Sequence, residues 1–129
     1  MQSILGNTRK TDITFRADGR IDIAARVASL LSLHKGDVID VLDGGGELYL
    51  YVKLHAPTVG RHEAACFPTH ARSRHFRAWS KRLCRAMICK SGSGKGRVAL
   101  SVGSPARLPG MQTALPIIYS NILCHDTRG

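Results

Sequence analysis

Residues 11–23 read Thr-Asp-Ile-Thr-Phe-Arg-Ala-Asp-Gly-Arg-Ile-Asp-Ile, and this stretch decides the fold. Residues 11–16 alternate polar and apolar side chains, which is the period of a β-strand with one buried face. Asp18-Gly19 is a tight-turn pair, and residues 20–23 alternate again. The stretch therefore predicts a β-hairpin.

The pattern continues beyond the hairpin. Residues 24–31 are helical in composition, and their apolar side chains recur at helical spacing. Two turns, at residues 35–37 and 43–46, bracket further strands that we expect over 38–42 and 47–52. Residues 9–54 are thus predicted to form one module of β-β-α-β-β order.

Two segments of this module carry a family resemblance. They are residues 18–23, Asp-Gly-Arg-Ile-Asp-Ile, and residues 31–41, Leu-Ser-Leu-His-Lys-Gly-Asp-Val-Ile-Asp-Val. The module resembles the DNA-binding domain of the SpoVT/AbrB family, the swapped-hairpin barrel of bacterial transition-state regulators and many antitoxins. The likeness implies an intertwined homodimer that exchanges hairpins, with Arg16 and Arg20 on DNA.

Some residues depart from the family pattern. Ala24 stands where the family usually has proline, and Ala28 and Ser29 stand where it has basic residues. The resemblance therefore supports the family's fold more strongly than it supports the family's DNA-contacting surface.

Residues 61–123 are predicted to form a second module, small, basic and α+β, of no recognised type. After a connector at 55–62 we expect strands over residues 61–67, 76–79, 97–102 and 115–122. Ser80 is a candidate N-cap for a helix that runs to about Cys89, with Leu83, Ala86 and Met87 inward. Pro116 suggests an edge or the start of a strand. The whole chain is thus expected to be mainly β with short helices.

The net charge of +10 is confined to the second half. Residues 1–63 contain eight acidic and eight basic side chains, whereas residues 64–125 contain ten basic side chains and no acid. Such an excess causes self-repulsion unless a polyanion neutralises it, and nucleic acid is the obvious polyanion. An acidic protein, a membrane surface or a merely solubilising surface are the alternatives.

The candidate DNA-binding residues are basic side chains of both halves: Arg9, Lys10, Arg16, Arg20, Arg26, Arg72, Arg74, Arg77, Lys81, Arg82 and Arg85. Phe76 and Trp79 lie among them. This mixture of aromatic and basic residues suits stacking of single-stranded bases, but we expect both aromatic side chains to face the core.

Three other chemistries are weighed and set aside. Ser91–Gly96 is similar to a phosphate-binding loop, but Cys89 and Gly96 replace the required glycine and hydroxyl residue. His62, Cys66, His70 and His75 could bind zinc in principle, but their spacing differs from common structural sites. The acid-free second half offers no carboxylate to orient a catalytic base. We expect no enzyme activity, no cofactor, no metal and no small-molecule substrate.

The sequence therefore predicts a DNA-binding protein, either a bacterial transcriptional regulator or a mobile-element accessory protein, that binds duplex DNA as a dimer. Binding of RNA or of single strands, and an antitoxin-type protein interaction, are the alternatives. No run of 18 apolar residues and no secretory signal is present, so a cytoplasmic location without membrane association is expected.

The dimer is testable directly. Sedimentation equilibrium at micromolar concentration is expected to show a species of twice the 14.0 kDa chain mass. A single species at the chain mass would refute the dimer that the family resemblance implies.

Overall fold

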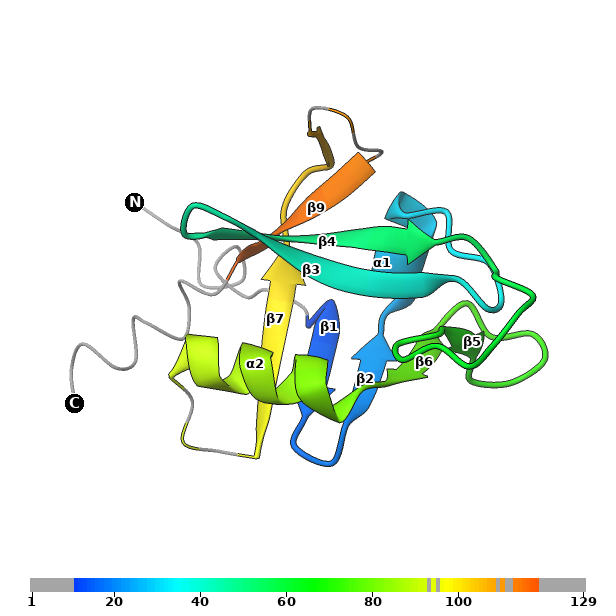
Figure 1. Cartoon of the computed structure of the whole chain (residues 1–129), viewed down its shortest axis with the longest axis horizontal. Helices are drawn as coiled ribbons and strands as arrows, with labels where there is room; N and C mark the ends of the chain where they lie inside the picture. The colour runs from blue at the N-terminus through cyan, green and yellow to red at the C-terminus, as the bar shows by residue number, and fades with distance from the viewer. Residues whose placement is uncertain (1–10, 93, 95, 109, 111–112, 119–129) are drawn as a thin grey trace, which may run out of the picture.

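A computed structural model of the chain describes residues 11–92, 94, 96–108, 110 and 113–118. Over these residues the chain forms one antiparallel sheet of nine strands, curved into a half-barrel, with two short helices. The predicted fold class, mainly β with short helices, is thereby confirmed. Figure 1 shows the arrangement, with α1 and α2 well separated.

The first half follows the predicted order of elements. Its elements are β1 (Ile13–Arg16), β2 (Arg20–Ile23), α1 (Ala25–Leu30), β3 (Val38–Gly44) and β4 (Glu47–Leu54). Gly19 forms the turn of the first hairpin with a φ of 102°, a conformation that glycine adopts without the steric cost of a Cβ.

The second half contains β5 (Phe67–Pro68), β6 (Phe76–Trp79), α2 (Lys81–Ser91), β7 (Arg97–Val102), β8 (Ala106–Arg107) and β9 (Thr113–Ile118). Ser80 caps α2 as predicted, because its hydroxyl accepts a hydrogen bond from the Leu83 backbone N–H at 3.1 Å. Gly92 ends the helix in the left-handed conformation, with a φ of 70°.

Two predicted strands differ from the structure. The strand expected over 61–67 is reduced to Phe67–Pro68, and its last residue, Pro68, pairs with Phe76. The last strand begins at Thr113, and residues 119–122 of the prediction lie outside the described residues.

Pro116 is not at a sheet edge as expected, because β9 lies between β4 and β7 in the strand order. Proline has no N–H to donate, but it is tolerated at this position because the strand that pairs with one edge of β9 changes from β8 to β7 around Pro116. Residues Ile117 and Ile118 pair with β7, whereas Thr113 and Ala114 pair with β8.

Strands of the two halves alternate within the sheet. The order is β3-β4-β9-β7-β1-β2-β6-β5, so the first hairpin lies between β7 and β6, and β9 lies between β4 and β7. Strands from the two predicted modules, 9–54 and 61–123, therefore share one sheet. Both outer edges of the first hairpin are paired within the chain, β1 with β7 and β2 with β6.

The two ends of the strand order are also joined. The Ile39 N–H donates to the Ala64 carbonyl at 3.1 Å, and the Cys66 N–H donates to the Asp37 carbonyl at 2.7 Å. These bonds connect the start of β3 to the segment just before β5, as the curved shape of the sheet allows.

The core fills the concave side of this sheet. Ile13, Phe15 and Ile21 of the first hairpin have no exposed surface, and Cys84 and Met87 of α2 belong to the same buried cluster. Figure 1 shows α2 crossing in front of β7, β1 and β2. Ala86, expected inward, is exposed.

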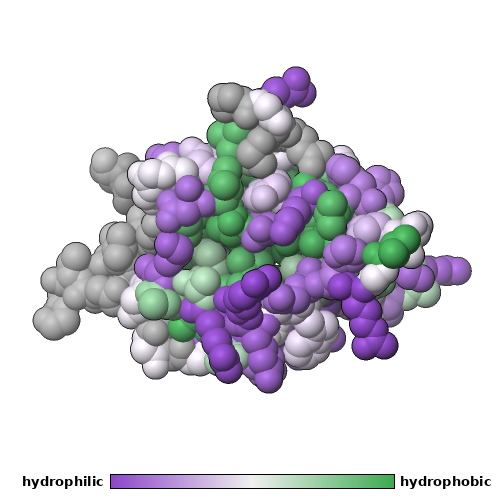
Figure 2. Space-filling model, viewed as in Figure 1, coloured by the Kyte–Doolittle hydropathy of each residue, from purple (hydrophilic) through white to green (hydrophobic). Residues whose placement is uncertain are grey.

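Apolar side chains remain visible between β3 and α2 (Figure 2). A shallow groove of about 290 Å³ lies there, and its apolar lining includes Val41, Leu83 and Ala86. Figure 2 also shows hydrophilic residues gathered over the exposed side of α2 and the adjoining β1–β2 turn.

Gly19 provides a test of the contact between the first hairpin and α2. A Cβ on Gly19 would lie 2.8 Å from Lys81 Cγ and 3.1 Å from the Lys81 backbone nitrogen. Gly19→Ala is expected to destabilise the protein by about 2–4 kcal/mol, through left-handed strain and this clash together.

Gly45→Ala is the matched control, since Gly45 also has a positive φ, of 74°, but no atom lies within 4 Å of its added Cβ. It is expected to cost about 1–2 kcal/mol in urea denaturation. Equal losses in the two variants would contradict the proposed packing of the hairpin on α2.

Candidate nucleic-acid interface

The strand register aligns basic side chains across the convex side of the sheet. Arg20 on β2 is opposite Trp79 on β6, and Arg16 on β1 is opposite Arg97 on β7. Arg16 and Arg20 follow the paired residues Phe15 and Ile21 toward the hairpin turn, so continuation of that register sets them side by side. Directly opposite residues of antiparallel strands point to the same face. One row therefore crosses four strands, and it spans about 14 Å at the usual strand spacing of about 4.8 Å.

A second row runs beside the first. Asp22 on β2 is opposite Arg77 on β6. We call the two rows together the arginine face and define it by Arg16, Arg20, Asp22, Arg77, Trp79 and Arg97. The buried residues between them in sequence, Phe15, Ile21, Ala78 and Val98, point into the core, so the arginine face is the outer surface.

Asp22 holds three arginines at once. Its carboxylate accepts hydrogen bonds from Arg16 Nε at 2.9 Å, Arg20 Nε at 3.3 Å and Arg77 Nε at 3.1 Å. One carboxylate against three guanidinium groups leaves two positive charges in excess. The cluster fixes the guanidinium groups in place while leaving most of their charge available to an anion.

The pKa of Asp22 reflects this cluster. Partial burial would raise the pKa of the carboxyl, but hydrogen bonds from Arg16 and Arg77 and the charge of Arg20 outweigh burial. The pKa is therefore lowered from the ordinary aspartate value. Asp22 is ionised at neutral pH.

Trp79 lies on the arginine face and not in the core as expected. Its side chain is 55% exposed, whereas Phe76 is 8% exposed and buried as predicted. Residues three apart on a β-strand point to opposite faces, so Phe76 and Trp79 cannot both be inward. The alternation of residues 76–79 was the available signal for this exposed tryptophan.

Arg97 was missed by the site prediction and belongs to the same row. It is the first residue of β7, at an exposed position of the alternating pattern. Only the pairing of β1 with β7 shows that it lies beside Arg16.

Lys81, Arg82 and Arg85 lie in the first half of α2, which begins two residues after Trp79. The positive end of a helix dipole disfavours bases there, and no acidic residue is present in the first turn of α2. Arg82 pairs with Glu63 at 3.1 Å. Lys81 and Arg85 have no acidic partner among the residues that the structure describes.

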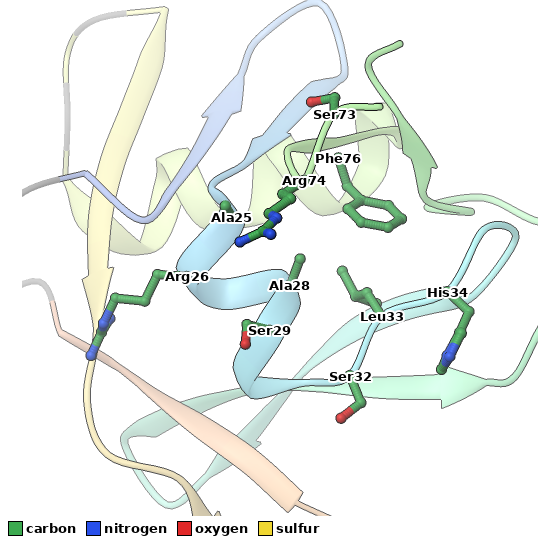
Figure 3. A pocket seen from close by; sticks show the side chains of 10 residues that line it. All are labelled: Ala25, Arg26, Ala28, Ser29, Ser32, Leu33, His34, Ser73, Arg74 and Phe76. Carbon is green, nitrogen blue, oxygen red and sulfur yellow. The ribbon is translucent and has the colours of Figure 1, made fainter. Parts of the chain in front are cut away.

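Arg26 and Arg74 lie elsewhere, at a hollow of about 750 Å³ between α1 and the loop before β6 (Figure 3). In Figure 3 the Arg26 side chain points away from the hollow, and it binds the buried Asp12 carboxylate at 2.8 Å. The Arg74 side chain lies over the start of α1, near Ala25. Phe76 and Leu33 form the apolar floor.

The predicted DNA-binding residues thus fall into separate groups. The arginine face and the adjoining α2 bring together Arg16, Arg20, Arg77, Lys81, Arg82 and Arg85. Arg26 and Arg74 are at the α1 hollow, and Arg72 is exposed in the loop before β6. Arg9 and Lys10 lie outside the described residues.

The candidate zinc residues are not gathered into a site. Cys66 is fully buried, and burial together with the charge of Asp37 raises the pKa of its thiol to about 12. His75 Nδ1 accepts the Ala25 N–H at 3.2 Å, and His62 Nε2 bonds the Val59 carbonyl. Within the described ranges, no cluster of three histidine, cysteine or acidic side chains is suited to hold a metal ion.

The structure describes only part of Ser91–Gly96, the segment similar to a phosphate loop, since Ser93 and Lys95 lie outside the described residues. Across the described part of the chain, no helix combines the length and apolar character needed to span a membrane.

Comparison of the chain with models of known protein families, with curated proteins and with solved structures finds no match.

Asp22→Asn tests the three-arginine cluster. Because folding lowers the pKa of Asp22, its contribution to stability is present above the unfolded-state pKa and is lost as pH falls through the folded-state pKa. The variant is expected to lose about 1–2 kcal/mol of unfolding free energy at pH 7. In urea denaturation series, the difference from the unaltered protein should shrink as pH falls below the ordinary aspartate pKa of 3.8.

Asp40→Asn is the control, since among the described residues Asp40 has one ion pair, with Lys53 at 4.0 Å, and accepts the Val41 N–H. It is expected to change stability by less than about 0.5 kcal/mol. A pH-independent loss in Asp22→Asn would contradict the charge-based role of Asp22.

Proposed function

We propose that the protein binds nucleic acid through the arginine face, without catalysing a reaction. The observation that carries the proposal is the cluster of three guanidinium groups on the single Asp22 carboxylate. Guanidinium groups bind phosphate oxygens in a planar, two-point geometry, and their positions here are fixed in advance. Binding then loses little side-chain entropy.

The size of the face fits a sugar-phosphate backbone. A row of about 14 Å matches about four nucleotides of a stacked strand at about 3.4 Å each. Trp79 at one end of the row adds an exposed apolar surface. Phosphates make no favourable contact with such a surface, but bases can stack on it. Lys81 and Arg85 beside it extend the positive charge.

DNA remains the target that the sequence analysis favours, and a role as a bacterial regulator or mobile-element accessory protein remains a proposal from the AbrB-like resemblance of residues 9–54. The homodimer also stays a prediction. Within the chain, strands β6, β7 and β9 lie beside the strands of residues 9–54 and complete their sheet.

The proposal predicts which arginines matter. Replacement of Arg16 and Arg20 by glutamine is expected to lower nucleic-acid affinity by at least about tenfold at low salt. The slope of log affinity against log salt should become shallower by about 1.5–2, because two phosphate contacts are lost. Fluorescence anisotropy of a labelled oligonucleotide at several salt concentrations measures both quantities.

The double variant Arg72→Gln, Arg74→Gln removes the same charge from the loop before β6 and serves as the matched control. This control should lose clearly less affinity than Arg16→Gln, Arg20→Gln, and its salt slope should change clearly less. Equal effects in the two double variants would show that net charge, and not the arginine face, drives binding. Asp22→Asn should act in the opposite direction and raise affinity, provided that it is folded at the pH of the assay.

A further inference from the structure

Trp79 has an unusual environment for a tryptophan. Its side chain is 55% exposed on the convex side of β6, and in the described structure no hydrogen bond or ring contact holds its indole. Exposure of a large aromatic surface to water costs free energy that burial would recover. Such a side chain is suited to contact with a ligand.

An aromatic neighbour accompanies Trp79. Phe67 on β5 is 47% exposed and stands opposite Arg77, two residues from Trp79 on β6. It is therefore the diagonal neighbour of Trp79 on the same face, at a typical separation of about 7–8 Å. The two rings flank Arg77 at the end of the arginine face.

A hollow of about 650 Å³ adjoins Trp79 on the side of α2. It is lined by Trp79, Gly19, Lys81, Arg85 and four neighbouring residues. Two of those neighbours are acidic, and both are engaged: Asp18 accepts the Arg20 N–H at 3.0 Å, and Glu63 pairs with Arg82 and accepts the Ser80 hydroxyl. The hollow offers an aromatic wall beside cationic side chains.

We propose, on the basis of the nucleic-acid binding proposed above, that the arginine face takes single-stranded nucleic acid and stacks an unpaired base on Trp79. In a duplex the faces of the bases are covered by their neighbours, so only phosphates and groove edges are accessible. A single strand exposes base faces, and stacking on an aromatic side chain contributes to binding without sequence preference.

The shape of the face agrees with this choice of ligand. The major groove of duplex DNA admits an α-helix or a two-stranded ribbon. The row from Trp79 to Arg97 instead crosses four neighbouring strands of the sheet. A flexible strand can follow such a surface, with phosphates on the arginines and a base on Trp79.

The chain contains a single tryptophan, so its intrinsic fluorescence reports this position alone. The experiment titrates the full chain with a 12-nucleotide dT strand, a 12-nucleotide rU strand and a 12-base-pair duplex. Saturable quenching by a single strand, with little quenching by the duplex, is the expected result. Quenching by either dT or rU supports the inference, and their relative affinities identify the preferred sugar.

Two variants separate stacking from charge, with a labelled strand and anisotropy as the readout. Trp79→Ala is expected to weaken single-strand binding by about 5- to 150-fold with an unchanged salt slope. Trp79→Phe should retain most of the affinity, since an aromatic ring is kept. Trp79→Ala should weaken duplex binding by a clearly smaller factor than single-strand binding, because a duplex offers no unpaired base to stack.

Unchanged single-strand affinity in Trp79→Ala would overturn the inference. If Arg16→Gln, Arg20→Gln still weakened binding in that case, the proposed function would stand alone. Absence of binding to all three nucleic acids would overturn both proposals. Fluorescence that changes with protein concentration, and not with added strand, would assign Trp79 to an interface between copies of the chain and would also overturn the inference.

Discussion

Backbone pairing between β2 and β6 places Arg20 opposite Trp79 and Asp22 opposite Arg77. This ladder joins the two halves of the chain, whose charges are so different in sequence. The acid-free half is thereby brought against the half that contains the acids, and Asp22, Glu63 and Asp43 each pair with a base from beyond residue 64. The self-repulsion expected of the basic half is reduced within the fold.

Two further acidic side chains of the first half are buried. Asp12 and Asp37 are almost fully buried and bind backbone N–H groups: Asp12 accepts Val102 N at 2.9 Å, and Asp37 accepts His34 N and Ala56 N. These carboxylates stabilise turns and strand ends, and they do not face solvent. On the outer surface of the sheet, the Asp22 carboxylate pairs with three arginines. The outer surface of the sheet is consequently more positive than the balanced composition of residues 1–63 suggests.

A row of arginines across the convex side of the sheet, with an exposed indole at its end, suits the proposed ligand, an extended polyanion that carries aromatic groups. The arginines supply charge and the sheet supplies rigidity, because strand register sets the positions of the arginines and Arg16, Arg20 and Arg77 share the Asp22 carboxylate. The hollow at α1, with Arg74 above an apolar floor, is chemically different and lies apart from this row. The chain thus separates the predicted basic residues into surfaces that mutagenesis can distinguish.

Local rules in the sequence were sufficient for the two hairpins of the first half, the strand at 76–79 and the Ser80 cap, because turn glycines, alternation and capping act between near neighbours. They also required Trp79 and Phe76 to face opposite sides, a consequence that the sequence analysis overlooked. Only the tertiary structure decided that β9 enters between β4 and β7, that Pro116 is interior, and that Arg97 lies beside Arg16. Those results depend on strand pairing across many residues, where the partner is chosen by packing of the whole core and leaves no mark on the local pattern.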